Sequence, residues 1–506
     1  MRKTIRLFGI LLAAATLLSL LAILPVAADG EEDVVLISSD AEMQAFAEAV
    51  NGGNDFEDKT VKLTADVALN TSIGVAGSKP FSGNFDGQGH TVTLDQTFNN
   101  PDGAGGLFTY VRIPADSELT IQNVHVTGTI VAHNTKGEDN YYGYIGGLIS
   151  TVDASKGGSG GTLNVLNCWS SVRFNLYEVR WWAIGGMIGF TRHEDGLKPL
   201  TINMDSCVWD GIINSAPALE SSGGLIGYTG MNKSGRPLTI NVSNTVVAGE
   251  IWLNTSWTDD TGLILGYMKG NKDTEEVTVT LDNIIVTGKI NSSVDIDGGK
   301  WVGLLATSGV TTVTLNKVYY LSFDIPGKGT VAVNTGSGTA NQTDVKAIQD
   351  AAEFLTLTGD DFTDASAWYF YNDGEHTPIP KSYGLAFGMI EPDPEENPGE
   401  NPGENPGENP GENPGENPGE NPGENPGENP GENPGENPGE QPGEATGTTV
   451  TTAEPETQAP VTTVGATEET KTEKKGCGAT VGAAGAILLA ASFAGAAFAR
   501  KKKEND

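Results

Sequence analysis

The amino-acid sequence predicts an all-β fold. It is a right-handed parallel β-helix (solenoid) of about seven coils with short helical caps, followed by a disordered stalk and one transmembrane helix. Three observations predict the β-helix: a glycine-rich segment that recurs at a fixed period, alternating apolar residues between its copies, and rows of matched residues one period apart. The period is considered first because it decides the architecture.

The recurring segment has its fullest form in Gly-Gly-Leu-Ile-Gly-Tyr at residues 223–228. The glycine that precedes the Leu or Met recurs at intervals of 41, 39, 38, 38 and 41 residues, at Gly106, Gly147, Gly186, Gly224, Gly262 and Gly303. A period near forty residues is typical of stacked repeats, in which each repeat buries its inner face against its neighbours.

Between these segments, apolar residues alternate as in a strand with one buried face. The alternating triplets begin at residues 119, 163, 202, 240, 279 and 313. Five residues after each start lies a second row: Val124, Cys168, Cys207, Thr245, Ile284 and Val318. Six residues further lies a third row: Ile130, Phe174, Ile213, Ile251 and Ile290. The apolar spacing of three and four that a helical repeat needs is missing, so we expect three short strands per coil.

A polar row precedes the second apolar row directly. It consists of Asn123, Asn167, Ser206, Asn244, Asn283 and Lys317. Asparagine tolerates the left-handed backbone conformation and can bond to an asparagine one coil away, so we expect a corner of the solenoid here.

These residues resemble those of a known family. The Gly-Gly-Leu-Ile-Gly-Tyr pattern, followed by a strand and Asn-Cys-Trp at 167–169, is similar to bacterial surface proteins that carry GLUG motifs. Residues 81–92 resemble their opening coil, and residues 366–380 resemble their closing segment. The resemblance covers roughly residues 35–383 and implies a β-solenoid displayed outside the cell. The family has no single activity, so the resemblance implies no particular function.

The N-terminus is predicted to be a signal peptide, residues 1–28. Basic residues precede an apolar run from Leu7 to about Leu24, and small residues follow at 26–28. Residues 29–59 form the predicted N-terminal cap. Ser39 and Glu42 have capping-box spacing, and the next apolar residues share one helical face: Met43, Phe46, Ala47 and Val50.

The β-helix repeats are expected over residues 60–325, and a C-terminal cap over residues 326–390. In that cap, Asp344 to Leu355 is predicted to form a second short helix. The aromatic run at 368–371 is expected to cover the last coil, because an open end leaves backbone groups unpaired.

Residues 391–475 are predicted to be a disordered acidic stalk. Asn-Pro-Gly-Glu occurs eleven times from Asn397 to Glu440, and such a composition cannot build a core. Residues 476–499 are the predicted transmembrane helix, and the basic tail at 500–506 is expected in the cytoplasm. This layout predicts an exported protein on the surface of a Gram-positive type of envelope, held in the cytoplasmic membrane.

The net charge of −36 excludes nucleic acid and anionic lipid as expected partners. Polyuronates would also be repelled unless calcium bridged them. Asp295 and Asp297 could bind calcium, and no other cofactor is predicted.

Cys168 and Cys207 fall in one row on adjacent coils, where a disulfide is sterically allowed. A free buried pair is favoured, because the same row elsewhere holds Val, Thr and Ile, so the need for a small buried side chain is sufficient explanation. The sequence does not indicate the oligomeric state.

Catalytic motifs give little support for an enzyme. The sequence holds no zinc-helix motif, nucleophile elbow or phosphate loop. Asp205 and Asp282 occupy equivalent positions two coils apart, about 10 Å, at or beyond the usual separation of a glycosidase pair. Solvated outer-face acids are the simpler interpretation. An enzyme that acts on polysaccharides, a lyase or glycosidase, stays the alternative.

Aromatic residues just before the Gly-Leu strands are the candidate ligand-binding residues: Tyr142, Tyr144, Trp181, Trp182, Trp257 and Trp301. Stacked coils would bring them onto one edge, where sugar rings could lie, although packing over the loops and strand edges is the favoured explanation. The predicted function is a non-catalytic, adhesin-like surface that binds extracellular glycans or proteins. A surface spacer with no specific ligand is a further alternative.

Overall fold

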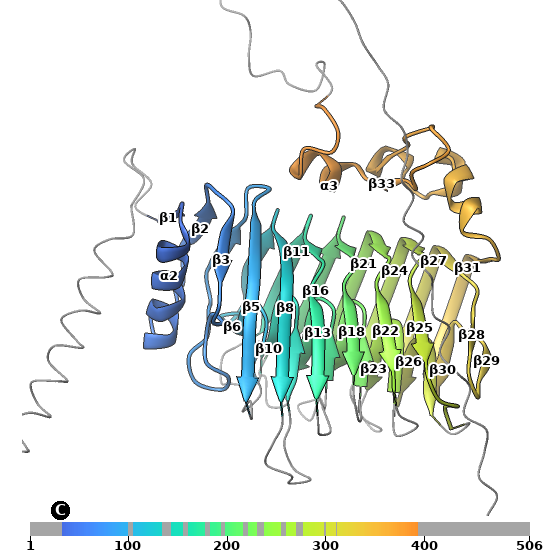
Figure 1. Ribbon diagram of the computed structural model, residues 1–506, viewed down its shortest axis with the longest axis horizontal. Helices are drawn as coiled ribbons and strands as arrows, with labels where there is room; N and C mark the ends of the chain where they lie inside the picture. Colours follow the sequence, from blue (N-terminus) through green and yellow to red (C-terminus); the bar gives the residue numbers. More distant parts are fainter. Residues whose placement is uncertain are drawn as a thin grey trace, which may run out of the picture. The chain divides into compact units, whose positions relative to one another are not determined.

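The structure is a computed structural model that describes residues 33–99, 105–133, 143–154, 160–177, 183–193, 198–215, 221–229, 237–254, 260–269, 277–297, 300–309 and 311–392 (Figure 1). The predicted signal peptide, transmembrane helix and basic tail, and the stalk from residue 393 onward, lie outside these residues. None of the helices in these ranges meets the length and hydropathy that a membrane-spanning helix requires.

Most of the described chain is β-strand, arranged in long parallel sheets whose strands stack one repeat apart, as in a β-helix or solenoid (Figure 1). The larger sheet contains two strand sets. The first set is β7 (Ser117–Gln122), β11 (Gly161–Leu166), β16 (Leu200–Asp205), β21 (Leu238–Val247), β24 (Val277–Val286), β27 (Thr311–Leu321) and β31 (Thr339–Ile348). The second set is β5 (Thr91–Asn99), β8 (His125–His133), β12 (Trp169–Ser170), β13 (Arg173–Tyr177), β17 (Val208–Trp209), β18 (Ile212–Ser215), β22 (Glu250–Leu253) and β25 (Lys289–Ser292).

The other sheet holds the glycine-rich segments. Its strands are β6 (Phe108–Arg112), β9 (Tyr144–Gly146), β10 (Ile149–Asp153), β14 (Ala183–Gly185), β15 (Ile188–Arg192), β19 (Ser221–Gly223), β20 (Ile226–Thr229), β23 (Asp260–Lys269), β26 (Trp301–Ser308) and β30 (Asn334–Gly336). The N-terminal strands β1 (Val34–Ile37), β2 (Thr60–Leu63), β3 (Val67–Leu69) and β4 (Asn84–Asp86) join the larger sheet. Two antiparallel pairs complete the strands: β28 (Asp324–Ile325) with β29 (Gly329–Thr330), and β32 (Trp368–Tyr369) with β33 (Ile379–Pro380).

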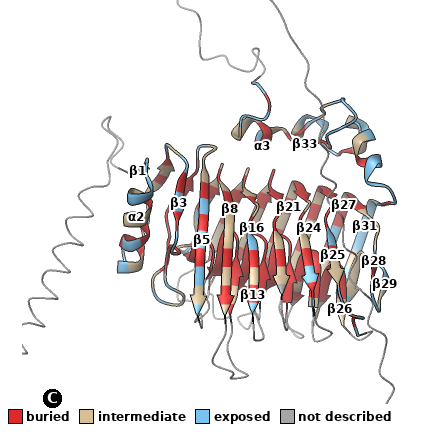
Figure 2. Cartoon of the chain, viewed as in Figure 1, coloured by how far each residue is buried: buried red, intermediate tan, exposed pale blue. Residues whose placement is uncertain are grey.

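Equivalent residues of successive repeats lie directly beside one another, as predicted. Ile202 pairs with Leu163 on one side and with Ile240 on the other, and Ile240 pairs with Val279. All four side chains are fully buried, and buried residues alternate with more exposed ones along the strands (Figure 2). The core is therefore a set of columns of apolar side chains, each shared between neighbouring repeats.

The predicted polar corner is confirmed. Every member of the row from Asn123 to Lys317 has a left-handed backbone, with φ between 46° and 57°. Asn167 Nδ2 donates to Asn123 Oδ1 at 3.0 Å, and Asn283 Nδ2 donates to Asn244 Oδ1 at 3.1 Å. Where Ser206 interrupts the asparagines, Asn244 instead donates to a carboxylate oxygen of Asp205 at 2.9 Å.

The predicted N-terminal helix is present as α2 (Asp40–Gly52). Ser39 is its N-cap, and the Glu42 carboxylate accepts hydrogen bonds from the backbone and side chain of Ser38. The four residues of the predicted apolar face are fully buried, and the Phe46 ring packs edge-on against Phe81. The helix thus joins the apolar core next to the first strands.

The second predicted helix is wrong over its first half. Residues 344–348 belong to β31, which pairs with β27 as far as Leu321 and Ile348. Pairing along ten residues outweighs local helix preference here. Four short helices follow: the 3₁₀ helices η1 (Ala351–Thr356), η2 (Gly359–Asp361) and η3 (Ala365–Ala367), and α3 (Lys381–Ala386).

Residues 349–390, the C-terminal strap, do not close the last coil as expected. Trp368 is buried in a cluster with Val246, Ile285 and Tyr319, on the outer side of the solenoid. The strap ends beside an early repeat and not beside the last one. There the centroid of the Phe387 ring lies 6.4 Å from that of His125, the first residue of β8. The strap takes this course because the outer column it covers is apolar and would otherwise face water.

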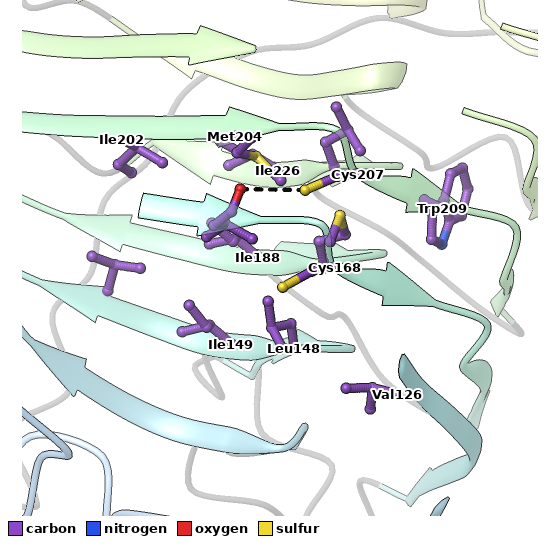
Figure 3. Packing of buried hydrophobic residues seen from close by; sticks show 14 of the residues in the cluster. Val126, Leu148, Ile149, Cys168, Ile188, Ile202, Met204, Cys207, Trp209 and Ile226 are labelled. Atoms are coloured by element: carbon purple, nitrogen blue, oxygen red, sulfur yellow. Dashed lines mark hydrogen bonds between the residues drawn. The ribbon is translucent and has the colours of Figure 1, made fainter. Parts of the chain in front are cut away.

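Cys168 and Cys207 are free, fully buried thiols, which confirms the favoured prediction (Figure 3). Cys207 Sγ lies 3.3 Å from the backbone oxygen of Val165, and Cys168 Sγ lies 3.4 Å from that of Ile121. Each thiol therefore donates a weak hydrogen bond to the preceding strand while filling a core position.

Candidate functional site

Five aromatic rings form a continuous stack on the glycine-rich sheet, the aromatic ladder: Tyr144, Phe190, Tyr228, Tyr267 and Trp301. Ring centroids of successive members are 4.1, 5.4, 5.5 and 5.9 Å apart. The first three pairs are nearly parallel, with interplanar angles of 7°, 8° and 16°, and the last pair is tilted by 51°.

The ladder draws its rings from two adjacent columns of complementary size. The column before the glycines contains Tyr144, Ala183, Ser221, Asp260 and Trp301. The column after them contains Thr151, Phe190, Tyr228, Tyr267 and Ala306. Each repeat thus places one aromatic residue in one column and a smaller residue in the other, so the ring has room to stack.

The geometry of the ladder indicates a packing role. Parallel stacking covers the flat faces of the inner rings, and Phe190 and Tyr228 are only 4% and 8% exposed. A sugar ring needs an open aromatic face, which these rings do not offer. Of the predicted ligand-binding residues, Tyr144 and Trp301 are at the two ends of the ladder. The other four, Tyr142, Trp181, Trp182 and Trp257, lie outside the described residues.

The two carboxylates considered for catalysis are engaged in hydrogen bonds. Asp205 and Asp282 occupy one column with Ser243 between them, as predicted. Asp205 accepts from Ser206, Ser243 and Asn244, and Asp282 accepts from Asn316 at 2.7 Å and from the strap residue Thr363 at 3.3 Å. Both side chains therefore act as links between neighbouring repeats.

The possible calcium ligands Asp295 and Asp297 lie in the loop after β25 and are exposed. Among the residues that the structure describes, no group of three or more His, Cys, Asp or Glu side chains is placed to hold a metal ion.

A different surface combines an exposed indole with amide side chains. It is formed by outward-pointing residues of β13, β18, β22 and β25, together with the residue that directly follows β22. We name it the Trp252 face. Its members are Asn175, Tyr177, Asn214, Trp252, Asn254 and Asn291. Trp252 is 39% exposed and Tyr177 is 42% exposed, the two large exposed aromatic side chains of these strands.

The indole of Trp252 is held in a fixed orientation. Its Nε1 donates to Oε2 of Glu250 at 2.8 Å. The same carboxylate oxygen accepts from Asn291 Nδ2 at 3.1 Å, and Lys289 Nζ lies 3.6 Å from the other oxygen. Glu250 thus orients the ring, while Lys289 balances its charge.

Asparagine amides flank this indole on the neighbouring repeats. Asn214 and Asn291 are the direct strand partners of Trp252, and Asn175 is the partner of Asn214. Asn254 Nδ2 donates to Asn214 Oδ1 at 3.2 Å. An oriented apolar ring beside groups that both donate and accept hydrogen bonds fits a sugar, whose ring face is apolar and whose rim carries hydroxyls.

Sequence reasoning missed Trp252, although a signal was present. Ile251 belongs to the third buried row, and in a strand the next residue points to the opposite face. The residues after that row are Val131, Asn175, Asn214, Trp252 and Asn291, an outward column with one large aromatic ring.

Comparisons with known proteins add little to this picture. No protein-family model matches the sequence, and no curated protein is significantly similar to it. One similar solved structure is described as a "putative immunoglobulin A1 protease from Bacteroides ovatus". It shares 15% identity over 69% of this chain and 92% of its own, with a TM-score of 0.30, and we infer no role from it.

Proposed function

We propose that this chain is an exported, membrane-anchored surface protein whose solenoid binds extracellular glycans through the Trp252 face, without cleaving them. In this proposal the solenoid is a right-handed parallel β-helix of about seven coils. The N-terminal export signal, the acidic stalk, the C-terminal apolar segment and the resemblance to GLUG-motif surface proteins support the placement outside the cell.

The observation that carries the binding role is the indole of Trp252, exposed yet fixed in orientation by Glu250. An exposed ring that is held in one orientation beside hydrogen-bonding amides offers a sugar both an apolar surface and polar partners, and this combination favours a ligand. Pre-orientation also lowers the entropy lost on binding, since the ring does not have to be immobilised.

The hydrogen bonding of Asp205 and Asp282 favours binding over hydrolysis. A catalytic pair needs one carboxyl group free to donate a proton and the other free to attack or to activate water. Both carboxylates instead accept hydrogen bonds from neighbouring repeats.

A glycan array probed with the full-length chain tests this proposal. Trp252→Ala should lower the affinity for the glycans that bind about 30-fold, about 2 kcal/mol, as for a tryptophan at the centre of a binding site. Tyr369→Ala is the matched control, because Tyr369 is similarly exposed, at 37%, but lies on the strap. Equal binding by both variants would contradict the proposal, and release of shortened glycans would favour the enzyme.

A further inference from the structure

We infer that the ligand of the Trp252 face is a chain of uncharged sugars that runs across at least three successive repeats, rather than one terminal sugar. This inference rests on the proposed function and adds the class of glycan and its direction. It starts from the presence of a second ring on the same face.

Tyr177 supplies that second ring. It extends from the end of β13, is 42% exposed, and stacks on the His133 ring with centroids 4.9 Å apart and an interplanar angle of 13°. Stacking on His133 covers one face of the tyrosine and fixes its orientation. The exposed part of Tyr177 is therefore oriented in advance, as is Trp252.

The two rings are two repeats apart on the solenoid. Strand β13 pairs with β18, and β18 pairs with β22, so Tyr177 and Trp252 are separated by about 10 Å along the stacking direction (Figure 1). A single sugar ring cannot cover both, whereas a chain of several sugars can.

Amide groups connect the two rings. Asn175 shares strand β13 with Tyr177, and Asn214 lies on the intervening strand β18 as the partner of both Asn175 and Trp252. Asn254 follows β22 and bonds to Asn214. A sugar chain between the rings would meet hydrogen-bonding groups on each repeat that it crosses.

Charge selects an uncharged chain. Glu250, the acid beside Trp252, is paired with Lys289, so the immediate surroundings of the ring are close to neutral. The whole chain carries −36, which repels polyuronates and other anionic glycans.

The test uses the full-length chain and oligomers of increasing length from the glycan that binds best on the array, measured by calorimetric titration. Affinity should rise with length until the chain covers both rings. Tyr177→Ala should remove this rise: the affinity for the longest oligomer should fall at least fivefold, and the affinity for the shortest should stay unchanged. Trp252→Ala should weaken binding of oligomers of every length. Tyr369→Ala again serves as the control.

The outcomes separate this inference from the proposed function. If no oligomer binds, the proposed function itself fails. If the shortest and longest oligomers bind equally, or Tyr177→Ala binds all lengths as the unchanged chain does, the extended ligand is wrong while glycan binding stands. Tighter binding of uronate oligomers of the same length would overturn the uncharged class.

Discussion

The indole N–H of Trp252 donates a 2.8 Å hydrogen bond to Glu250, two residues earlier on the same outward face of β22. Both side chains belong to one strand, and the Glu250 carboxylate also contacts Asn291 and Lys289 of the next strand, β25. The ring is thus a fixed feature of the repeat that carries it.

Replacing Glu250 tests this orientation. Glu250→Ala should weaken glycan binding about fivefold, because a hydrogen bond of about 1 kcal/mol no longer holds the ring. Glu250→Gln keeps an acceptor oxygen for the indole and should bind nearly as well as the unchanged chain. If both variants bind alike, Glu250 does not position Trp252.

The aromatic ladder should affect stability and not binding. Tyr228→Ala removes a ring stacked between Phe190 and Tyr267 and should lower the free energy of unfolding by about 3 kcal/mol. Trp301→Ala should cost less, because Trp301 stacks on one side only and is partly exposed. Urea unfolding gives both values, and a loss of glycan binding in a folded Tyr228→Ala chain would contradict the packing role.

The corner asparagines make a prediction about backbone strain. Asn244 has φ of 46°, donates to Asp205 and accepts from Asn283. Asn244→Ala should destabilise the fold by about 3 kcal/mol, because alanine disfavours this conformation and both hydrogen bonds are lost. Asn244→Gly loses only the two hydrogen bonds and should cost about 2 kcal/mol. Equal urea midpoints for the two variants would exclude strain as the cause.

The fold should lose stability at alkaline pH. Burial, helped by a hydrogen bond to Asp153, raises the pKa of Tyr110 from 10.0 to about 12, and burial raises the pKa of Cys207 from 9.0 to about 12. The folded state therefore favours the neutral forms. This stabilisation is complete below about pH 9 and is lost as the pH rises toward 12.

Circular dichroism followed during an alkaline titration measures this loss. Tyr110→Phe removes the phenol and should make unfolding less sensitive to pH between 10 and 12. An unchanged alkaline transition in this variant would show that the ionisation of Tyr110 does not contribute.

The repeat itself could be predicted from the sequence because stacking leaves a periodic record. Ile202 and Ile240 occupy equivalent positions since each buries against the other, and Asn167 and Asn283 recur since a corner requires a left-handed residue. Such constraints act on every repeat in the same way, so the column of a residue can be read from its place in the period.

The path of the strap could not be read in this way. The run at 368–371 is clearly apolar, but its local pattern does not say whether it covers the end or the side of the solenoid. The side is decided by an apolar outer column that includes Val246 and Ile285, which are far away in sequence. The aromatic ladder could not be predicted either. Which residue of a repeat supplies the stacked ring depends on the sizes of the residues in two adjacent columns.

The candidate site was predicted least well, for a related reason. A ligand-binding residue differs from the equivalent residues of the other repeats. The repeat pattern therefore predicts where such a residue lies but not what it does. Tyr144 and Trp252 both interrupt columns of smaller or polar residues. Only the structure shows that the first is part of a stack while the second is exposed beside amides.

Calorimetric titration of a glycan into the full-length chain and into Trp252→Ala and Trp252→Phe tests the central claim most directly. The account predicts that alanine lowers the affinity about 30-fold, and that phenylalanine, which keeps a ring but loses the hydrogen bond to Glu250, lowers it about fivefold. Undiminished binding by the alanine variant would contradict the account.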